Sequence, residues 1–436
     1  MRLLLLFIAT LFFGQLSAQE ILRLEDAVAA ALQNNYDIRL SRNDSAAYSL
    51  DASYAYAGFL PRLNATGTKV WNVNAQKQEL QDGRKPEATG IKSSNLTASL
   101  QLNWTLFDGL KMFVTRERLL ELEKLGDLGV KNQVTNTVAT VVNNYYNIVR
   151  TKQQLKAVEE QISINEERVK LADMKVSVGL GSKPELLQAR VDLNAQKAAR
   201  LQQLTLIAQL RDQLNQLIGF RMGLVYEVAD SIPVNTVLQY GDLEQNLEAS
   251  SPNLLFARKN IDIAQLTVKE RRAELLPIVA FNSAYNYSRT SNTTVINTFT
   301  PLFNQNNGYN YGFSVNIPIL NNFNTRRLMK QAQLDVRYQQ LFYDNQFTLT
   351  QVGLTNAFKD YELQKDLLAL EEANIGFARE NVAIALERFR QGVSTFLELR
   401  EAQISLEEAN SRLIAARYNT KLAETELLRL KGGLLQ

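Results

Sequence analysis

Hydrophobic and polar residues alternate strictly in four short stretches of the chain. The stretches cover residues 62–74, 94–107, 278–288 and 310–319. In the first stretch, mainly leucine, tryptophan and valine side chains share one face, while asparagine and threonine side chains share the other. Alternation over this length predicts strands that each have one buried face. We expect two hairpins, 62–107 and 278–320, with polar loops at 75–93 and 289–309.

Long helical stretches precede and follow each predicted hairpin. Residues 24–59 predict one uninterrupted helix, and residues 108–178 contain no proline. About 71 helical residues with a rise of ~1.5 Å each would span roughly 106 Å. The return helix predicted at 184–218 is only half as long. A second short helix, predicted at 242–276, must therefore cover the remainder.

The two halves of the chain repeat one plan. Gly179 corresponds to Gly392 and Glu185 to Glu398 at one common offset, and Pro61 corresponds to Pro277 at nearly the same offset. Repeats of this size indicate an architecture built from copies. We predict a first repeat at 19–218 and a second at 242–436, each with a helix, a hairpin, a long helix, a turn and a helix. A mid-height connector at 219–241 joins them, and the turns are predicted at 179–183 and 391–395.

Heptad-like spacing predicts which helix faces pack together. In the last helix the predicted seam is Leu399, Ala402, Leu406, Ala409, Leu413, Ala416, Thr420, Ala423, Leu427 and Leu430. In the first long helix it is Leu155, Val158, Ile162, Val169, Ala172 and Val176, with Asn165 as the exception. The second long helix repeats this spacing with Leu368, Ile375, Ala378, Val382, Ala385 and Phe389. A sustained repeat of this kind predicts coiled-coil packing.

The N-terminus has the features of a secretory signal peptide. Arg2 precedes an apolar run from Leu3 to Phe13, and small residues follow up to Ala18. The alternative is a membrane anchor, but the run has about half the ~20 residues that a spanning helix needs. We predict a signal peptide at 1–18 and no spanning helix in the remainder of the chain.

The composition excludes several classes of chemistry. The 436 residues include no cysteine and no histidine, so disulfides, His-ligated zinc and Ser-His-Asp catalysis are excluded. The net charge of +3 and the lack of a basic patch with interleaved aromatic residues argue against nucleic acid as a partner. The glycine-rich segment 179–185 matches no phosphate-binding motif, and no predicted strand precedes it. We therefore expect neither an enzyme nor a cofactor site.

The predicted strands need a partner for their apolar faces, and outer-membrane lipid fits. The helices already bury their apolar stripes against each other, and the strands match the ~9–11 residues of a tilted spanning strand. An open four-stranded sheet cannot lie in hydrocarbon, so more than one chain must close a barrel. A dimer with eight strands and a trimer with twelve both satisfy the count, and the asparagine-rich inner face favours the larger barrel. Pro61 and Pro277 then mark helix-to-strand junctions at the membrane.

With these features, nearly all of the sequence after residue 18 resembles the TolC-like outer-membrane efflux proteins. The motifs that carry the resemblance, besides the duplication, are TLFDGL (105–110), IPILNN (317–322), VGLGSKPELLQAR (178–190) and QGVSTFLELREAQ (391–403). The resemblance implies a mixed α and β membrane protein: a trimeric twelve-stranded outer-membrane β-barrel, four strands per chain, continuous with a long periplasmic α-helical barrel of coiled-coil helices. It also implies a passive duct of a tripartite export system, with a periplasmic adaptor protein and an inner-membrane pump as partners.

The resemblance also suggests site residues. The turns expected to dock the adaptor comprise Val178, Gly179, Leu180, Gly181 and Ser182, and Gly392, Val393, Ser394 and Thr395. Glu398 and Glu401 match two acidic positions that ring the periplasmic entrance in the family, and Glu185 is the counterpart of Glu398 in the first repeat. The alternative is that these glutamates are solvated residues of a charged helix. Better-studied members latch the closed tip with a tyrosine and an arginine, where this chain has Phe389 and Ser394.

Several alternatives stay open from the sequence. A non-transporting coiled-coil scaffold or adhesion protein of the cell envelope would also need long helices and hairpins. Within export, drug efflux, metal efflux and protein secretion all remain possible substrate classes. The absence of histidine and the five methionines argue mildly against a duct for soft metals.

Overall fold

The computed structural model describes residues 21–179, 181–245, 247–296 and 299–435. The predicted signal peptide at 1–18 lies outside these residues. The chain divides into two compact units. Unit 1 takes Met1–Ser45, Gly126–Ala257 and Phe342–Gln436, and unit 2 takes Ala46–Leu125 and Arg258–Leu341. Each unit therefore combines segments from both sequence repeats.

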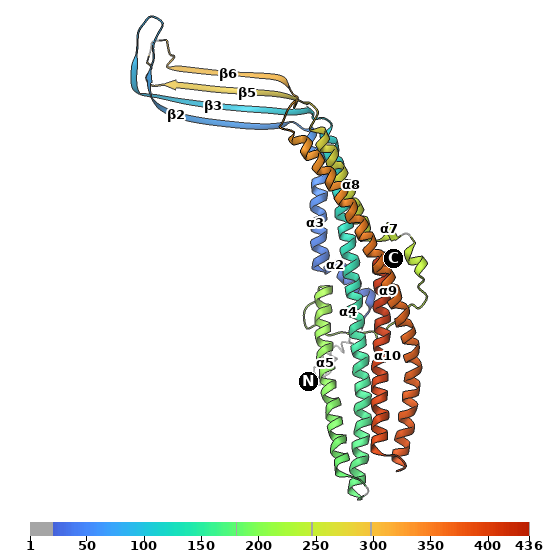
Figure 1. The fold of residues 1–436 in the computed structure, drawn as a ribbon. Coiled ribbons are helices and arrows are strands. Elements are labelled where there is room, and N and C mark those ends of the chain that lie inside the picture. Colours follow the sequence, from blue (N-terminus) through green and yellow to red (C-terminus); the bar gives the residue numbers. More distant parts are fainter. Residues whose placement is uncertain (1–20, 180, 246, 297–298, 436) are drawn as a thin grey trace, which may run out of the picture. The chain divides into compact units, whose positions relative to one another are not determined.

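Unit 2 contains a four-stranded antiparallel sheet (Figure 1). Its strands are β2 (Arg62–Lys77), β3 (Glu87–Phe107), β5 (Ile278–Asn292) and β6 (Phe303–Asn316), in the order β2-β3-β5-β6. The two hairpins are thus joined through the pairing of β3 with β5. Within the described part of the chain, the outer edges of β2 and β6 have no neighbouring strand.

The register aligns the predicted apolar faces across all four strands. Leu63 pairs with Leu102, Trp104 with Phe281, and Phe281 with Phe313. On the other face, the Asn282 amide donates to the Ser314 hydroxyl at 2.8 Å, and the Ser99 hydroxyl donates to the Asn286 amide oxygen at 2.9 Å. Directly paired residues lie on the same side of a sheet. The sheet therefore has one largely apolar face, which Lys69 and Arg289 interrupt, and one largely polar face, as the alternation predicted.

The strands are longer than predicted, and the loops correspondingly shorter. The predicted polar loops 75–93 and 289–309 contract to residues 78–86 and 293–302. The ends of β2 and β3 are held by an ion pair between Lys77 and Glu87 at 2.8 Å. These ends are mostly polar and do not alternate regularly, so alternation could not reveal them. The second hairpin ends at Asn316 rather than at 320, because Pro318 has no N–H to donate to a ladder.

The helix predicted over residues 24–59 is wrong as one element. It is broken into α2 (Leu24–Asn34), α3 (Tyr36–Ser53) and a 3₁₀ helix η1 (Ala55–Phe59). The break is at Asn35, whose side-chain oxygen accepts hydrogen bonds from the backbone N–H groups of Asp37 and Ile38. Its amide also donates to the Leu217 carbonyl at 2.9 Å. Asparagine thereby starts a new helix by capping it.

The helix predicted at 242–276 is also wrong as one element. The structure has α6 (Tyr240–Glu244), α7 (Leu247–Ser250) and α8 (Pro252–Ala273) in its place. Pro252 explains the last break, since a proline disfavours helical geometry in the residue before it and is well suited to a first helical position. Leu243, Leu247 and Leu254 pack in a buried cluster with Leu354, Tyr361, Ala423 and Leu427.

The long helices of the two repeats have equal lengths. Both α4 (Lys111–Ser177) and α9 (Asn324–Arg390) have 67 residues, and both α5 (Lys183–Ile218) and α10 (Phe396–Lys431) have 36. In unit 1, α4 and α10 lie between α5 and α9 (Figure 1). None of the helices in the described ranges combines the length and the hydrophobicity needed to cross a membrane.

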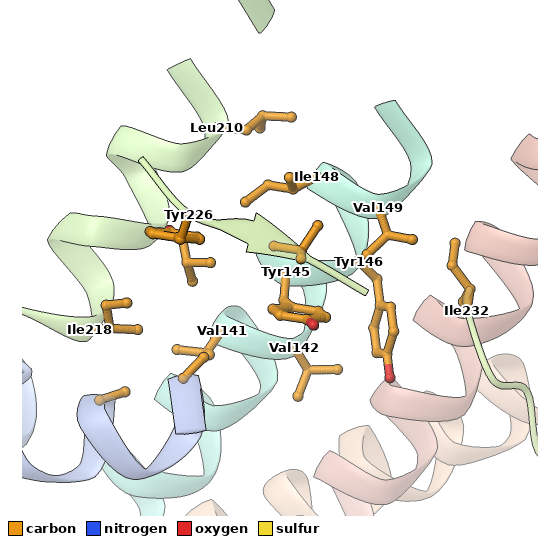
Figure 2. Close-up of a cluster of buried hydrophobic side chains, with 14 of the residues drawn as sticks. Val141, Val142, Tyr145, Tyr146, Ile148, Val149, Leu210, Ile218, Tyr226 and Ile232 are labelled. Atoms are coloured by element: carbon orange, nitrogen blue, oxygen red, sulfur yellow. The ribbon is translucent and has the colours of Figure 1, made fainter. Parts of the chain in front are cut away.

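The connector between the repeats packs on the main core of unit 1. It contains a short strand, β4 (Glu227–Val228), which pairs in parallel with β1 (Ile21–Leu22). Figure 2 shows Tyr145 of α4 beside this strand. The Tyr145 hydroxyl donates to the Leu22 carbonyl at 2.9 Å and accepts from the Ala229 N–H at 3.1 Å. One tyrosine thus ties both short strands to α4, a pairing that sequence reasoning missed.

The predicted seam is confirmed in the second repeat and partly in the first, where its apolar residues other than Ala172 are half-buried. On α10 every predicted seam residue is buried except Leu430, which is half-buried. Five of them pack against Leu368, Ile375, Ala378 and Val382 of α9. On the lower part of α4, only Ala172 of the predicted set is buried, and its buried neighbours are polar: Gln161, Asn165 and Arg168. Arg168 is buried because α5 and α10 supply hydrogen-bonding partners for its guanidinium.

Candidate functional site: two helical turns and a polar cluster beside them

The turn between α4 and α5 depends on two glycines in different ways. Gly179 has a φ of +79°, which a side chain adopts only with strain. Gly181 has an ordinary φ, but a Cβ there would lie 2.8 Å from the Lys175 Cβ. Val178 is 67% exposed, and Leu180 lies outside the described residues. The turn therefore presents an exposed valine on a backbone that requires glycine at both positions.

The turn between α9 and α10 has a similar backbone but a different start to its return helix. Gly392 has a φ of +76°, and the Val393 N–H donates to the Arg388 carbonyl at 3.0 Å. The Thr395 hydroxyl accepts from the Glu398 N–H at 3.2 Å and caps α10. Ser182, which precedes α5, makes no such side-chain cap. Val393 is 65% exposed, so both turns present a valine to solvent.

Lys175 joins the two turns through Phe389. Its ammonium lies 3.7 Å from the centre of the Phe389 ring and donates to the Phe389 carbonyl at 3.1 Å. An ion pair between Glu167 of α4 and Arg390 of α9 lies alongside. Such a cation–π contact is favourable where the ring is buried, and Phe389 is only 3% exposed. Phe389, at the position where the resemblance suggests a latch, thus carries this cation–π contact. The Ser394 hydroxyl has no hydrogen-bond partner among the described residues.

The three predicted entrance glutamates are all exposed. Glu398 and Glu401 lie three residues apart on the first turns of α10, and Glu185 lies in the first turn of α5. In the part of the chain that the structure describes, none of the three forms an ion pair. Glutamates in a first helical turn are favoured by the helix dipole. One chain places two carboxylates on one helix face and the third on a neighbouring hairpin.

A buried polar cluster lies beside the turns, and sequence reasoning missed it. Its centre is Arg168 of α4, which is 1% exposed. The Arg168 guanidinium donates to the Asp192 carboxylate of α5 at 2.5 Å and to the Gln403 side-chain oxygen of α10 at 2.7 Å. Arg400 of α10 donates to the same Asp192 oxygen at 3.2 Å. The one available signal was Asn165, the polar exception in an otherwise apolar seam.

Burial and hydrogen bonding oppose each other in this cluster. Burial lowers the pKa of the Arg168 guanidinium, and the bond to Asp192 offsets only part of that effect. Burial acts to raise the pKa of Asp192, but hydrogen bonds from Gln188 and Arg168 outweigh it and hold the pKa below its usual value. Asp192 is therefore ionised at neutral pH and ties three helices together.

Pro61 and Pro277 each stand directly before a strand. Pro61 follows η1 and precedes β2, and Pro277 follows α8 and precedes β5. The Trp104 indole N–H donates to the Phe59 carbonyl at 2.9 Å, next to the first of these junctions. A proline lacks the N–H that a helix interior would need, so each junction ends a helical segment and starts a strand.

Comparison with known proteins identifies the family to which this architecture belongs. Residues 27–220 and 243–433 match the family model described as "Outer membrane efflux protein". The chain belongs to this family. The two matched stretches leave out the connector around β4. The family places the protein in the outer membrane, with a large periplasmic part.

Individual relatives are distant but similar over most of their length. The outer membrane efflux protein BepC of Brucella suis biovar 1 is 23% identical over 439 residues, which cover 98% of this chain and 88% of BepC. The alkaline protease secretion protein AprF of Pseudomonas aeruginosa is 21% identical over 438 residues, which cover 94% of this chain and 86% of AprF. Relatives of this kind serve both efflux and secretion.

Solved structures share the fold. The outer-membrane channel OprN superposes with a TM-score of 0.77 at 17% identity, covering 94% of this chain and 90% of OprN. CusC superposes with a TM-score of 0.78 at 16% identity, covering 94% of this chain and 92% of CusC. The protein thus has the fold of an outer-membrane efflux channel, and the predicted fold class and location are confirmed.

Proposed function

We propose that three copies of this chain form a passive export duct that receives substrates from a periplasmic adaptor and an inner-membrane pump. The observation that carries the proposal is the four-stranded sheet with one apolar face and, among the described residues, two unpaired edges. Such a sheet can lie in lipid only if further copies pair with β2 and β6 to close a barrel. Three copies give the twelve strands that the polar inner face favours.

The helices of unit 1 support the same assembly. Leu363, Leu370, Phe377 and Ile384 recur every seven residues on α9, and each is more than half exposed in the single chain. On α5, Leu187, Val191 and Leu201 are also more than half exposed. Since α5 and α9 are the outer helices of unit 1, these two rows are free to pack between copies as a coiled-coil seam.

Engineered disulfides can count the copies. Leu201 lies roughly five helical turns after the start of α5, and Leu370 lies about as far before the end of α9. The two positions are therefore at similar distances from the loops that join the long helices. The wild-type chain has no cysteine, so the two introduced thiols are the only ones available. In a closed trimer they should cross-link neighbouring chains into a ladder that stops at three. A ladder that stops at two would establish the dimer instead. Moving the second cysteine to Glu372, about 200° around the helix, should abolish cross-linking.

A pore test decides between a duct and a scaffold. The purified protein should produce discrete conductance steps in a planar bilayer, with no added energy source. A coiled-coil scaffold would produce none.

We further propose that Glu398, Glu401 and Glu185 line the periplasmic entrance, where three-fold symmetry would gather their charges within the ~8 Å screening length. Replacing Glu398 and Glu401 by alanine should then reduce cation selectivity, and an unchanged selectivity would place the ring elsewhere.

We also propose that the two turns dock the adaptor. The exposed valines Val178 and Val393 are better test positions than Gly181, whose replacement would distort the turn itself. Val178→Asp and Val393→Asp should each reduce adaptor binding, measured with purified protein on a sensor surface, while conductance persists. Binding that survives the double replacement would place the docking surface away from the turns.

A further inference from the structure

A polar cavity lies on the α4–α5–α10 side of unit 1, around Arg168. Its volume is about 180 Å³, and it is partly open to solvent. The residues that matter to its chemistry come from three helices: Gln161 and Arg168 from α4, Asp192 and Gln196 from α5, and Arg400 and Gln403 from α10. A cavity with this lining differs from the apolar interior of the second hairpin.

The charged residues that line the cavity balance in number but not in burial. Two guanidinium groups, Arg168 and Arg400, share the single carboxylate of Asp192. The other charged residue of the lining is Glu407, which is exposed and accepts a hydrogen bond from the Gln196 amide at 3.1 Å. An exposed carboxylate is hydrated and offsets a buried cation only weakly. Arg400 is itself partly hydrated, since its side chain is 37% exposed. The excess of positive charge is therefore partial and lies on the Arg400 side of the cavity.

The cavity also has an excess of hydrogen-bond donors. Arg168 Nε, Gln161 Nε2 and Gln403 Nε2 are buried and have no partner among the described residues. The orientation of the Gln403 amide is determined, because its oxygen accepts from Arg168 and its nitrogen must point elsewhere. Gln196 Oε1 is a buried acceptor without a partner in the same described ranges. Arg168, Gln161 and Gln403 are all less than 5% exposed, so bulk solvent does not satisfy their donors.

We propose that this cavity binds one small inorganic anion, of a size between chloride and phosphate. An anion would add negative charge between Arg168 and Arg400 and accept from the free donors of Arg168, Gln161 and Gln403. Charge-assisted hydrogen bonds of this kind are about twice as strong as neutral ones. Water can satisfy the donors but cannot neutralise the charge. The bound anion would hold α4, α5 and α10 together just behind the turns.

A single replacement should substitute for the anion. Gln403→Glu keeps the shape and the oxygen that accepts from Arg168, and it replaces the free donor with a second carboxylate oxygen. The wild-type protein should unfold at a higher temperature in chloride or phosphate than in gluconate, a much larger anion, at equal ionic strength. In gluconate, Gln403→Glu should unfold at a temperature at least as high as that of the wild type in chloride. Its unfolding temperature should no longer rise when small anions are added.

Two further variants make the test specific. Gln161→Leu removes one free donor without touching an ion pair. The chloride concentration that gives half of the rise in unfolding temperature should increase roughly tenfold, because one charge-assisted hydrogen bond is lost. Gln202→Glu adds the same charge as Gln403→Glu at an exposed position of α5 and should leave the response unchanged.

Three outcomes would overturn the proposal. Equal unfolding temperatures of the wild type in chloride, phosphate and gluconate would mean that the cavity holds water only. A response that persists in Gln403→Glu, or one that Gln202→Glu also removes, would mean that anions act elsewhere. Because the readout is unfolding, failure here leaves the proposed duct intact, and failure of the pore test leaves the anion site intact.

Discussion

The two helical hairpins of unit 1 have the same lengths but different interiors. Both pair a helix of 67 residues with one of 36 residues. Between α9 and α10 the interior is a leucine–alanine seam. When Gly179 is aligned with Gly392, the first hairpin has Asn165 at the place of Ala378 and Gln196 at that of Ala409. Duplication thus preserved the backbone plan, while the packing chemistry diverged.

The difference suggests different tasks for the two hairpins. An apolar seam of alternating large and small residues is close-packed and stabilises without directional contacts. A buried Arg–Asp pair, here Arg168 and Asp192, costs desolvation energy and is stable only while each partner remains in place. The second hairpin is therefore the better rigid element, and the first depends on α10 for its charge partners. Replacements at matched positions should reveal this asymmetry.

The largest effect is expected from Asp192→Asn. This change leaves the Arg168 guanidinium buried without its carboxylate, which costs about 3 kcal/mol or more. Asp173→Asn breaks an exposed Asp–Arg pair between the same two helices, with Arg190 at 3.3 Å, and should cost no more than about 1 kcal/mol. Thermal unfolding of the detergent-solubilised protein, followed by helical circular dichroism, compares them. Equal losses would mean that burial of the Arg168 pair has no special weight.

The contribution of Asp192 should also depend on pH. Its pKa in the folded protein is lowered from the ordinary value of 3.8, so the folded state holds the proton less tightly than the unfolded state does. The carboxylate therefore contributes its full stability above about pH 3.8 and loses it as the pH falls through the folded-state pKa. The stability difference between the wild type and Asp192→Asn should be constant from about pH 5 to 7 and shrink below about pH 4. A difference that grows in acid would contradict this assignment.

A smaller effect is expected from matched leucines of the two seams. Leu406 is 8% exposed on α10, and Leu193, its counterpart on α5 in the same alignment of the repeats, is half-buried. Leu406→Ala should cost about 2–4 kcal/mol through lost burial and a cavity, and Leu193→Ala about half as much. The same unfolding measurement compares the two. If Leu193→Ala costs as much as Leu406→Ala, the first interior is as tightly packed as the second.

Lys175→Met should loosen the contact between the turns by about 1–2 kcal/mol, because it removes both the cation over the Phe389 ring and the hydrogen bond to the Phe389 carbonyl. Hydrogen exchange of peptides from 385–395 should accelerate, while peptides from the middle of α9 keep their rates. Lys170→Met, an exposed change on the same helix, is the control. Unchanged exchange at 385–395 would show that other contacts hold Phe389.

Particular residues show what the sequence could and could not predict. Alternation identified the shared face of Trp104, Phe281 and Phe313, because a period of two assigns every side chain to a side of the sheet. Heptad spacing identified the buried residues of α10, because a helical period assigns every side chain to a face of the helix. Burial of Arg168 could not be inferred, since its partners Asp192 and Gln403 lie 24 and 235 residues away and arginine is ordinarily a surface residue.

The break in the first predicted helix was missed because no local residue marks it. Asn35 lies in a stretch with no proline or glycine, and its role as a break depends on the distant Leu217 carbonyl. The turn residues were located from glycines that recur in both repeats. Their contacts, such as Lys175 on Phe389, required the packing of α4 against α9. Positions could thus be predicted from pattern, whereas partners across the fold could not.

The smallest expected effect compares the caps at the two turns. The Thr395 hydroxyl caps α10 by accepting from the Glu398 N–H, whereas Ser182 makes no side-chain cap at α5. Thr395→Ala should therefore cost about 1 kcal/mol of local stability, and Ser182→Ala close to none. Hydrogen exchange of the amides in the first turn of each helix measures this, since a lost cap frays only that turn. Because Glu398 lies in this turn, fraying in Thr395→Ala should also broaden the distribution of single-channel conductance if the proposed entrance ring is correct. Equal protection of both first turns in the two variants would show that Thr395 stabilises α10 no more than Ser182 stabilises α5.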